Sequence, residues 1–281
     1  MPGMCPHPLI GGSMPEVQFS HAAPMDGSFT EMMSLEEIDT NIYRAGYVFE
    51  EPYALYGGQV AAQSLMAAGL TVDDDRAPHS LHGYFLRPGN AAKPTVLQVF
   101  RDRDGRSFSA RRVVALQEGK VIFSMSASFA HPVESPEYGD RLPVEEAPKG
   151  THSTLPRMFG FEARTTEQVY DAKDYPLRFW ARCTEDLGDS QLLHQCALTY
   201  LSDISSGVGA YNTEDFRSDA SLDHVVWFHR EIDMNGWVLM DLHPEAVTHG
   251  RGLYRGRLGD ENGEHLATIA QETLFRPTKK D

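Results

Sequence analysis

Two stretches of the sequence recur in the same order and at nearly the same separation along the chain. Residues 79–85 (HSLHGYF) match residues 221–227 (SLDHVVW) at an offset of 142 positions, which aligns His82 with His224. Residues 119–125 (GKVIFSM) match a segment 144 positions later (GEHLATI). A chain that repeats its motifs in one order is predicted to fold as two copies of a single module, with their sheets joined or packed face to face.

The pattern of the first half predicts one helix followed by antiparallel strands. Residues 59–69 (QVAAQSLMAAG) are rich in alanine, which favours a helix that can pack closely against a sheet. Segments with strand character, separated by turn signals such as Asp104-Gly105, follow at 80–86, 95–103, 107–117 and 120–130. A helix followed by strands in hairpins is typical of an α+β domain.

The second half repeats this order of elements. A strand is predicted at 177–185 and a helix at 191–211. Further strands are predicted at 222–232, 236–247, 252–260 and 265–275. The duplicated layout therefore favours two modules of the same α+β class.

Changes in composition suggest where the modules begin and end. Residues 1–33, rich in Pro, Gly, His and Met, are expected to form a loose extension. Ser34, followed by Glu37 at capping-box spacing, predicts the start of a helix. The predicted units are a first module at 34–130, a linker at 131–164 rich in Pro, Glu, Gly and Ser, a second module at 165–277, and a tail at 278–281.

Composition also limits the classes of function. The formal net charge of −15 disfavours nucleic-acid binding, because phosphate contacts need a basic surface. No apolar run approaches the about 20 residues that a membrane-spanning helix requires, so membrane insertion is not expected. The three cysteines are too scattered for a disulfide framework or a zinc site. With no signal-peptide pattern and no peroxisomal C-terminal tripeptide, we expect a cytoplasmic protein.

Five segments together carry a family resemblance. They are residues 56–65 (YGGQVAAQSL), 79–89 (HSLHGYFLRPG), 105–129 (GRSFSARRVVALQEGKVIFSMSASF), 222–230 (LDHVVWFHR) and 269–277 (IAQETLFRP). The FLRPG and SFSARRV blocks are the most specific of these motifs. From about Ser34 to Pro277 the chain resembles the acyl-CoA thioesterase II family.

The resemblance implies a double hotdog fold, in which each module wraps a curved antiparallel sheet around a long helix. It also implies three catalytic residues, which are Asp203 in LTYLSDISS, Ser221 in DASLDHVVWF and Gln271 in TIAQET. Some members of the family carry Thr at the position of Ser221, and both residues supply a hydroxyl. The implied reaction is hydrolysis of fatty acyl-CoA to free fatty acid and coenzyme A.

These residue types suit that chemistry. Thioester hydrolysis needs an activated water and donors for the oxyanion, and a thiolate leaves readily, so no metal or cofactor is expected. A carboxylate can act as general base while a hydroxyl and an amide orient the water. No Gly-x-Ser-x-Gly elbow surrounds Ser221, so we expect it to orient water rather than attack. Backbone N–H groups at Gly57 and Gly58, or in the turn around Ser202 to Ser205, are the candidate oxyanion donors.

Each candidate also has a purely structural interpretation. Asp203 can cap a helix, Ser221 can begin a strand, and Gln271 can be an exposed strand residue. The order of Asp74 and His79 is similar to the Asp-His pair of hotdog hydratases, but DDDRAPH lacks the Asn-Pro between them. We therefore expect His79 to be structural or to line the substrate pocket rather than to catalyse.

Two other functions remain open at this point. A hotdog enoyl-CoA hydratase or dehydratase is disfavoured by the absent signature. A non-catalytic acyl-CoA sensor would need a partner module, and only the N-terminal extension is spare. For the leading function we expect a homo-oligomer, because a single double module leaves sheet edges and helix-free faces open. Candidates to meet the coenzyme A phosphates are Arg87, Arg106, Arg111 and Arg112.

Overall fold

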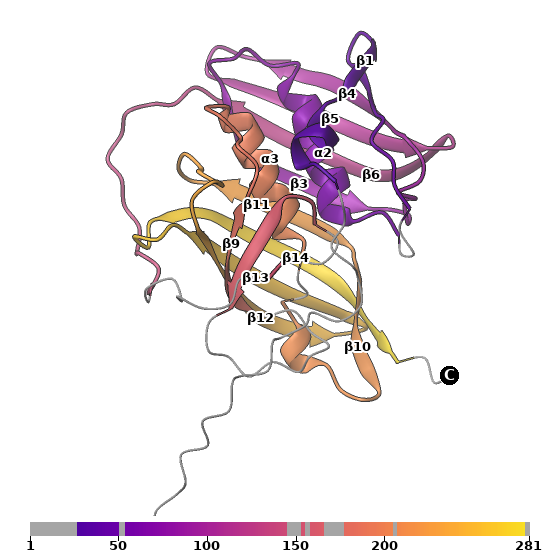
Figure 1. Cartoon of the computed structure of the whole chain (residues 1–281), viewed down its shortest axis with the longest axis vertical. Helices are drawn as coiled ribbons and strands as arrows, with labels where there is room; N and C mark the ends of the chain where they lie inside the picture. The colour runs from indigo at the N-terminus through magenta and orange to yellow at the C-terminus, as the bar shows by residue number, and fades with distance from the viewer. Residues whose placement is uncertain are drawn as a thin grey trace, which may run out of the picture.

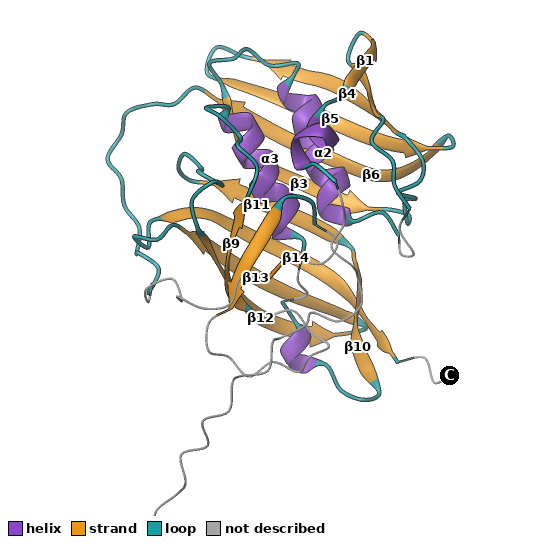
Figure 2. Cartoon of the chain, in the orientation of Figure 1, coloured by secondary structure: helices purple, strands orange, loops and turns teal. Residues whose placement is uncertain are grey.

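The computed structural model describes residues 27–50, 54–144, 153–154, 158–165, 177–204 and 207–278. Within these ranges the strands form one continuous antiparallel sheet that curves around two central helices (Figures 1 and 2). In Figure 1 the first half of the chain runs from indigo to magenta, the orange-to-yellow strands of the second half lie below it, and the orange helix α3 lies beside α2. The predicted α+β class is therefore confirmed.

The first half contributes two helices and six strands to the described fold. Their bounds are α1 Phe29–Met33, β1 Glu36–Asp39, β2 Ile42–Ala45, α2 Gly57–Gly69, β3 Ala77–Phe85, β4 Thr95–Asp104, β5 Phe108–Gln117 and β6 Lys120–Ala130. In space the strands follow the order β1-β2-β4-β5-β6-β3. The predicted central helix and the four strands after it are confirmed, each within a few residues.

The second half contributes the other elements. Their bounds are β7 Ser153–Thr154, β8 Phe161–Thr165, β9 Arg178–Cys183, α3 Gln191–Ser202, the 3-10 helix η1 Gly209–Tyr211, β10 Phe216–Ser221, β11 Asp223–Phe228, β12 Val238–Thr248, β13 Arg251–Gly259 and β14 His265–Pro277. The spatial order is β11-β14-β13-β12-β9-β8-β7, with β10 also paired to β14. The strands after α3 therefore repeat the order of those after α2.

The halves meet where β3 and β11 pair antiparallel, with Gly83 opposite His224 and Leu81 opposite Val226. Outward from this seam, β3-β6-β5-β4-β2 in one half corresponds to β11-β14-β13-β12-β9 in the other. The duplicated module read from the repeat is thus present. The repeat allowed the two sheets to be either joined or packed face to face, and in the structure they are joined edge to edge.

The repeat offset of 142 is wrong by one residue at this seam. It equates His82 with His224, but His82 is exposed whereas His224 is fully buried. The buried positions Leu81 and Gly83 instead correspond to His224 and Val226, at an offset of 143. Because side chains alternate between the two faces of a strand, a slip of one residue exchanges the core face for the outer face.

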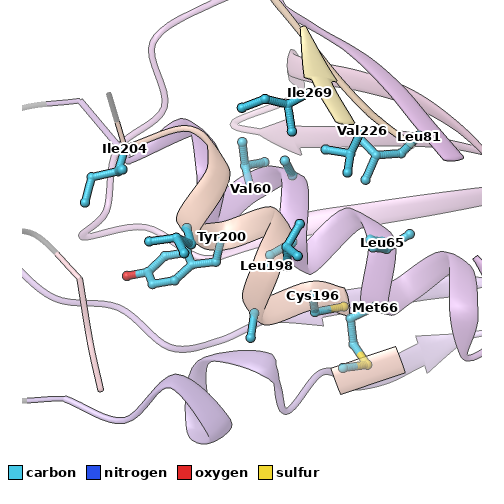
Figure 3. Packing of buried hydrophobic residues seen from close by; sticks show 14 of the residues in the cluster. Val60, Leu65, Met66, Leu81, Cys196, Leu198, Tyr200, Ile204, Val226 and Ile269 are labelled. Atoms are coloured by element: carbon cyan, nitrogen blue, oxygen red, sulfur yellow. The ribbon is translucent and has the colours of Figure 1, made fainter. Parts of the chain in front are cut away.

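The helices α2 and α3 pack directly against each other in opposite directions. A side chain at Gly58, near the start of α2, would collide with the carbonyl oxygen of Tyr200 near the end of α3. At the other end, a side chain at Gly69 would collide with Leu192. Figure 3 shows buried side chains of both helices beneath the sheet residues Val226 and Ile269. The glycines at the two ends of α2 thus allow its backbone to approach α3 directly inside the sheet.

The N-terminal boundary differs from the prediction. No helix begins at Ser34, which instead ends α1, and the following residues form β1 paired with β2. A left-handed Asn41 (φ 59°) turns the chain between these strands, so hairpin pairing overrides the local capping-box signal. Phe29 and Met32, placed in the predicted loose extension, are fully buried in the core. Residues 1–26 of that extension lie outside the described residues.

Two further boundaries are corrected in the second half. Residues 161–164 of the predicted linker belong to β8, which pairs with β9, so part of the second module's share of the sheet lies inside that segment. The helix predicted at 191–211 ends at Ser202, and η1 follows separately. The strand β10 was not predicted, because its sequence FRSDAS has no alternation of apolar and polar residues. Within the described ranges, no helix is both long and apolar enough to span a membrane.

The close approach of the helices makes Gly58 a specific stability determinant. We expect Gly58→Ala to lower the free energy of unfolding by about 1–3 kcal/mol, because the new methyl group meets backbone that cannot rotate away. Chemical denaturation monitored by circular dichroism measures this loss.

Gly46→Ala is the matched control, since a Cβ there meets no atom of the described residues within 4 Å. Its free energy of unfolding should change by less than about 0.5 kcal/mol. Equal stability of the two variants would contradict the account of helix packing.

Candidate active site

Asp203, Ser221 and Gln271 come together from three separate elements. Asp203 is the residue that ends α3, Ser221 is the last residue of β10, and Gln271 lies within β14. The Ser221 hydroxyl donates to Asp203 Oδ1 at 3.0 Å, and Gln271 Nε2 donates to the same oxygen at 2.8 Å. Gln271 Nε2 also reaches Ser221 Oγ at 2.7 Å. A carboxylate, a hydroxyl and an amide therefore share one hydrogen-bonded cluster.

The N-terminus of α2 completes this cluster from the other half of the chain. The backbone N–H of Gly58 donates to the Asp203 carboxylate. A side chain at Gly57 would collide with Asp203 Oδ2, so this oxygen lies directly beside the start of α2. The positive end of the α2 dipole thus faces a carboxylate supplied by α3. Asp203 does have a capping role, but for a helix other than its own.

Several of the predicted oxyanion donors are already engaged. The Gly58 N–H is bonded to Asp203, and the N–H groups of Asp203 and Ile204 both point back to the carbonyl of Leu201. Ser205 lies outside the described residues. Gly57, at the first position of α2, belongs to the first turn, in which backbone N–H groups have no partner within the helix.

Burial controls the electrostatics of the site. Asp203 is only 9% exposed and Gln271 only 1%, so the alternative that Gln271 is an exposed strand residue is wrong. Desolvation raises the pKa of the Asp203 carboxyl, against the opposing effects of His224, Gln271, Ser221 and the Gly58 N–H. A carboxylate whose pKa is raised in this way is a stronger base than an ordinary surface aspartate.

Two further polar side chains lie behind Gln271, and sequence reasoning assigned neither of them a role. His224 Nδ1 forms a short hydrogen bond with Gln271 Oε1, and His224 Nε2 lies 2.7 Å from Ser202 Oγ. Both His224 and Ser202 are fully buried. The sequence signal that could have identified His224 is a histidine at a core-facing strand position, where a polar ring needs hydrogen-bond partners.

His79 does not join this cluster. It lies near the start of β3, where its Nε2 is 2.8 Å from Ser128 Oγ and its ring packs edge-on against Phe108. Phe85, at the opposite end of the same strand, is the residue whose ring approaches Gly57. His79 instead lines a separate groove of about 750 Å³ together with Gln195, His229 and other residues.

Arg111 is excluded from a role in phosphate binding by its surroundings. Its side chain is only 1% exposed and donates to the carbonyls of Thr71 and Arg103 and to the carboxylate of Asp104. Arg112, on the opposite face of β5, stacks over the ring of Phe100. Among the described residues, no group of three His, Cys, Asp or Glu side chains is placed to hold a metal ion.

Two protein-family models match the chain in tandem. The acyl-CoA thioesterase N-terminal domain matches residues 50–130, and the acyl-CoA thioesterase C-terminal domain matches residues 134–275. Together they cover most of both modules, and α1, β1 and β2 precede the N-terminal match. The cluster of Asp203, Ser221 and Gln271 lies within the C-terminal match.

Individual relatives agree with these family models. Acyl-CoA thioesterase 2 of Haemophilus influenzae is 31% identical over 273 residues, covering 87% of this chain and 96% of that protein. Acyl-coenzyme A thioesterase 8 of Homo sapiens is 29% identical over 288 residues, covering 88% of each. A solved acyl-CoA thioesterase II from Mycobacterium marinum is 38% identical with a TM-score of 0.74, covering 90% of this chain and 98% of that one.

A hotdog-fold protein from Alicyclobacillus acidocaldarius shares the fold with a TM-score of 0.71 at 18% identity, covering 90% of this chain and 98% of that one. The predicted double hotdog is thereby confirmed, as is the resemblance read from the sequence motifs. The chain belongs to the acyl-CoA thioesterase II family and is a thioester hydrolase.

Proposed function

We propose that this protein hydrolyses fatty acyl-CoA with a water molecule activated by Asp203 and oriented by Ser221 and Gln271. The observation that supports this most directly is the convergence of the three side chains within 3.0 Å of one another in a largely buried site. Family membership supports the substrate class, because relatives are named acyl-CoA thioesterases.

The chemistry is a direct attack by water on the thioester. Asp203 takes a proton from the water while the water oxygen bonds to the carbonyl carbon, giving a tetrahedral oxyanion. The carbon–sulfur bond then breaks, and the proton held by Asp203 passes to the departing thiolate. One acyl-CoA and one water thus give one fatty acid and one coenzyme A, and the carboxylate is regenerated.

The hydrogen bonds at Asp203 suggest which atoms do this work. Oδ1 already accepts from Ser221 and Gln271, whereas Oδ2 lies beside Gly57. We infer that Oδ2 accepts the proton and that the Gly57 N–H stabilises the nearby oxyanion. The positive end of α2 would favour that charge as it develops.

We also propose a cytoplasmic homo-oligomer. The face of the sheet opposite α2 and α3 carries exposed apolar side chains, with Tyr84 (62%) and Trp227 (36%) on the two seam strands and Leu253 (41%) on β13, two strands from β11. Exposed apolar side chains grouped on a sheet face are typical of a surface that a second protein covers. A second copy of this chain is the simplest occupant, since a two-fold contact buries the same patch on both.

The general-base role predicts a large and specific loss of turnover in Asp203→Asn. We expect kcat to fall by about 10²–10⁴-fold, because an amide of nearly the same shape cannot take the proton from water. Free-thiol release from a panel of acyl-CoAs measures kcat, and the melting temperature is recorded on the same sample.

Asp223→Asn is the control, because it makes the same chemical change two residues from Ser221. Asp223 Oδ1 accepts a backbone hydrogen bond from Glu272 that an asparagine oxygen can also accept. This variant should keep kcat within about threefold. If Asp203 only capped α2, Asp203→Asn would lower the melting temperature and leave kcat normal.

The raised pKa of Asp203 predicts the position of the acid limb in the pH profile. The base must be ionised, so kcat/KM should rise with pH through the Asp203 pKa, above the ordinary aspartate value of about 3.9. A pH series of kcat/KM gives this limb. A limb at or below the ordinary value would contradict a desolvated base.

The same shift has a definite consequence for stability. A carboxyl whose pKa is higher in the folded state contributes stability at low pH, and that contribution is lost as pH rises through the folded pKa. Ionised Asp203 therefore costs stability at neutral pH. Asp203→Asn should consequently show an unchanged or higher melting temperature at pH 7, and the difference should shrink on acidification.

The proposed self-association predicts that a charge at Trp227 separates the copies. Trp227→Glu should lower the mass in solution, measured by light scattering, because a buried carboxylate has no partner in an apolar contact. Ile38→Glu introduces the same charge at an exposed position on β1, the edge strand farthest from the seam in the first half, so it serves as the control and should leave the mass unchanged. A wild-type monomer would contradict the proposal.

A further inference from the structure

We propose that His224 is a positioning residue, held in turn by Ser202, that fixes the Gln271 side chain with its NH₂ group toward Asp203 and Ser221. This rests on the proposed function and extends it by assigning a task to a residue that does not touch the substrate. It also explains why a histidine and a serine are buried side by side behind the catalytic cluster.

The supporting geometry is a closed ring of hydrogen bonds. Ser202 Oγ lies 2.7 Å from His224 Nε2, and His224 Nδ1 bonds to Gln271 Oε1. Gln271 Nε2 then reaches Asp203 Oδ1 at 2.8 Å. Since Ser202 immediately precedes Asp203, the ring returns to its starting point through one peptide bond, so each member restrains the next.

The hydrogen-bonding groups around the ring determine that His224 Nδ1 carries a hydrogen. An amide oxygen can only accept, so the ring nitrogen facing Gln271 Oε1 must carry a hydrogen. When the ring is neutral, the Ser202 hydroxyl donates to Nε2. Burial lowers the pKa of His224 and favours this neutral form, against the opposing attraction of Asp203.

The Ser202 hydroxyl can adapt if the ring becomes charged. Ser202 Oγ also lies 2.9 Å from the carbonyl oxygen of Thr199, to which it can donate instead while accepting from His224 Nε2. In both states His224 Nδ1 keeps its hydrogen. The orientation imposed on Gln271 is therefore the same whether or not the ring is protonated.

The orientation of Gln271 matters because the two ends of an amide have nearly the same shape. A half-turn would bring the amide oxygen to the place of Nε2, close to a carboxylate oxygen and to Ser221 Oγ. That arrangement loses two donated hydrogen bonds and adds repulsion with ionised Asp203. A donor behind Oε1 excludes the reversed form.

Packing alone does not call for a histidine at this position. His224, Val226 and Phe228 alternate on the helix-facing side of β11, and the other two are apolar. A fully buried imidazole costs stability unless its nitrogens are hydrogen-bonded. A polar residue with both nitrogens satisfied is what a positioning role requires.

Two substitutions separate the two ring nitrogens. In His224→Asn the side-chain NH₂ can occupy the place of Nδ1, and in His224→Gln it can occupy the place of Nε2. We expect kcat to stay within about threefold of wild type for His224→Asn and to fall about 10–100-fold for His224→Gln, with KM nearly unchanged in both. Equal losses in the two variants would overturn the proposal.

A double-mutant cycle with Gln271→Ala tests whether His224 acts through Gln271. Once the amide is gone, His224→Gln should lower kcat by less than about twofold further. A loss as large as in the wild-type background would show a purely structural effect and overturn the proposal. If Gln271→Ala itself kept full kcat, the proposed function would fail instead, so the two failures are distinguishable.

A measurement on the wild-type protein covers the case in which a His224 variant does not fold. With ¹⁵N-labelled histidine, the resonance of His224 is identified by its shift in Gln271→Ala. A hydrogen on Nδ1 at neutral pH supports the proposal. A neutral ring with its hydrogen on Nε2 and none on Nδ1 would falsify the proposal, because His224 would then offer no donor to Gln271 Oε1.

Discussion

The rest of the structure depends on the direct contact between the backbones of α2 and α3. Gly58 leaves no space between its own Cα and the carbonyl of Tyr200, and the Tyr56 hydroxyl donates to that same carbonyl at 2.7 Å. The contact fixes the start of one helix at the end of the other. A backbone N–H from the first module can therefore reach a carboxylate from the second.

Opposite charges occupy the two ends of α2. Asp203 lies at its N-terminus, whereas the buried Arg111 binds the carbonyl of Thr71 just beyond its C-terminus. Both positions match the polarity of the helix dipole, which favours an anion at its start and a cation at its end. The start of the same helix thus favours the ionised form of the Asp203 carboxyl, which burial disfavours.

Patterns that depend on long segments were readable from the sequence, whereas those that depend on single positions were not. Periodicity and turn signals predicted the central helix and the strands. The family motifs, which also span several residues, identified Asp203 and Gln271 as candidate site residues. The capping signal at Ser34 failed because strand pairing outweighs one local contact. The sequence did not reveal the role of His224, because it did not show which face of β11 this side chain occupies. A slip of one residue in the strand register moves the side chain from the core face to the outer face.

The seam between β3 and β11 also bears on how such a chain can evolve. In a dimer of identical single modules, both ends of the central helix pair would be the same by symmetry, and every mutation would alter both at once. Fusion into one chain removes that constraint. Here one end carries Asp203 and the other carries His79 with Ser128, so a mutation in the fused chain can alter one end of the helix pair without altering the other.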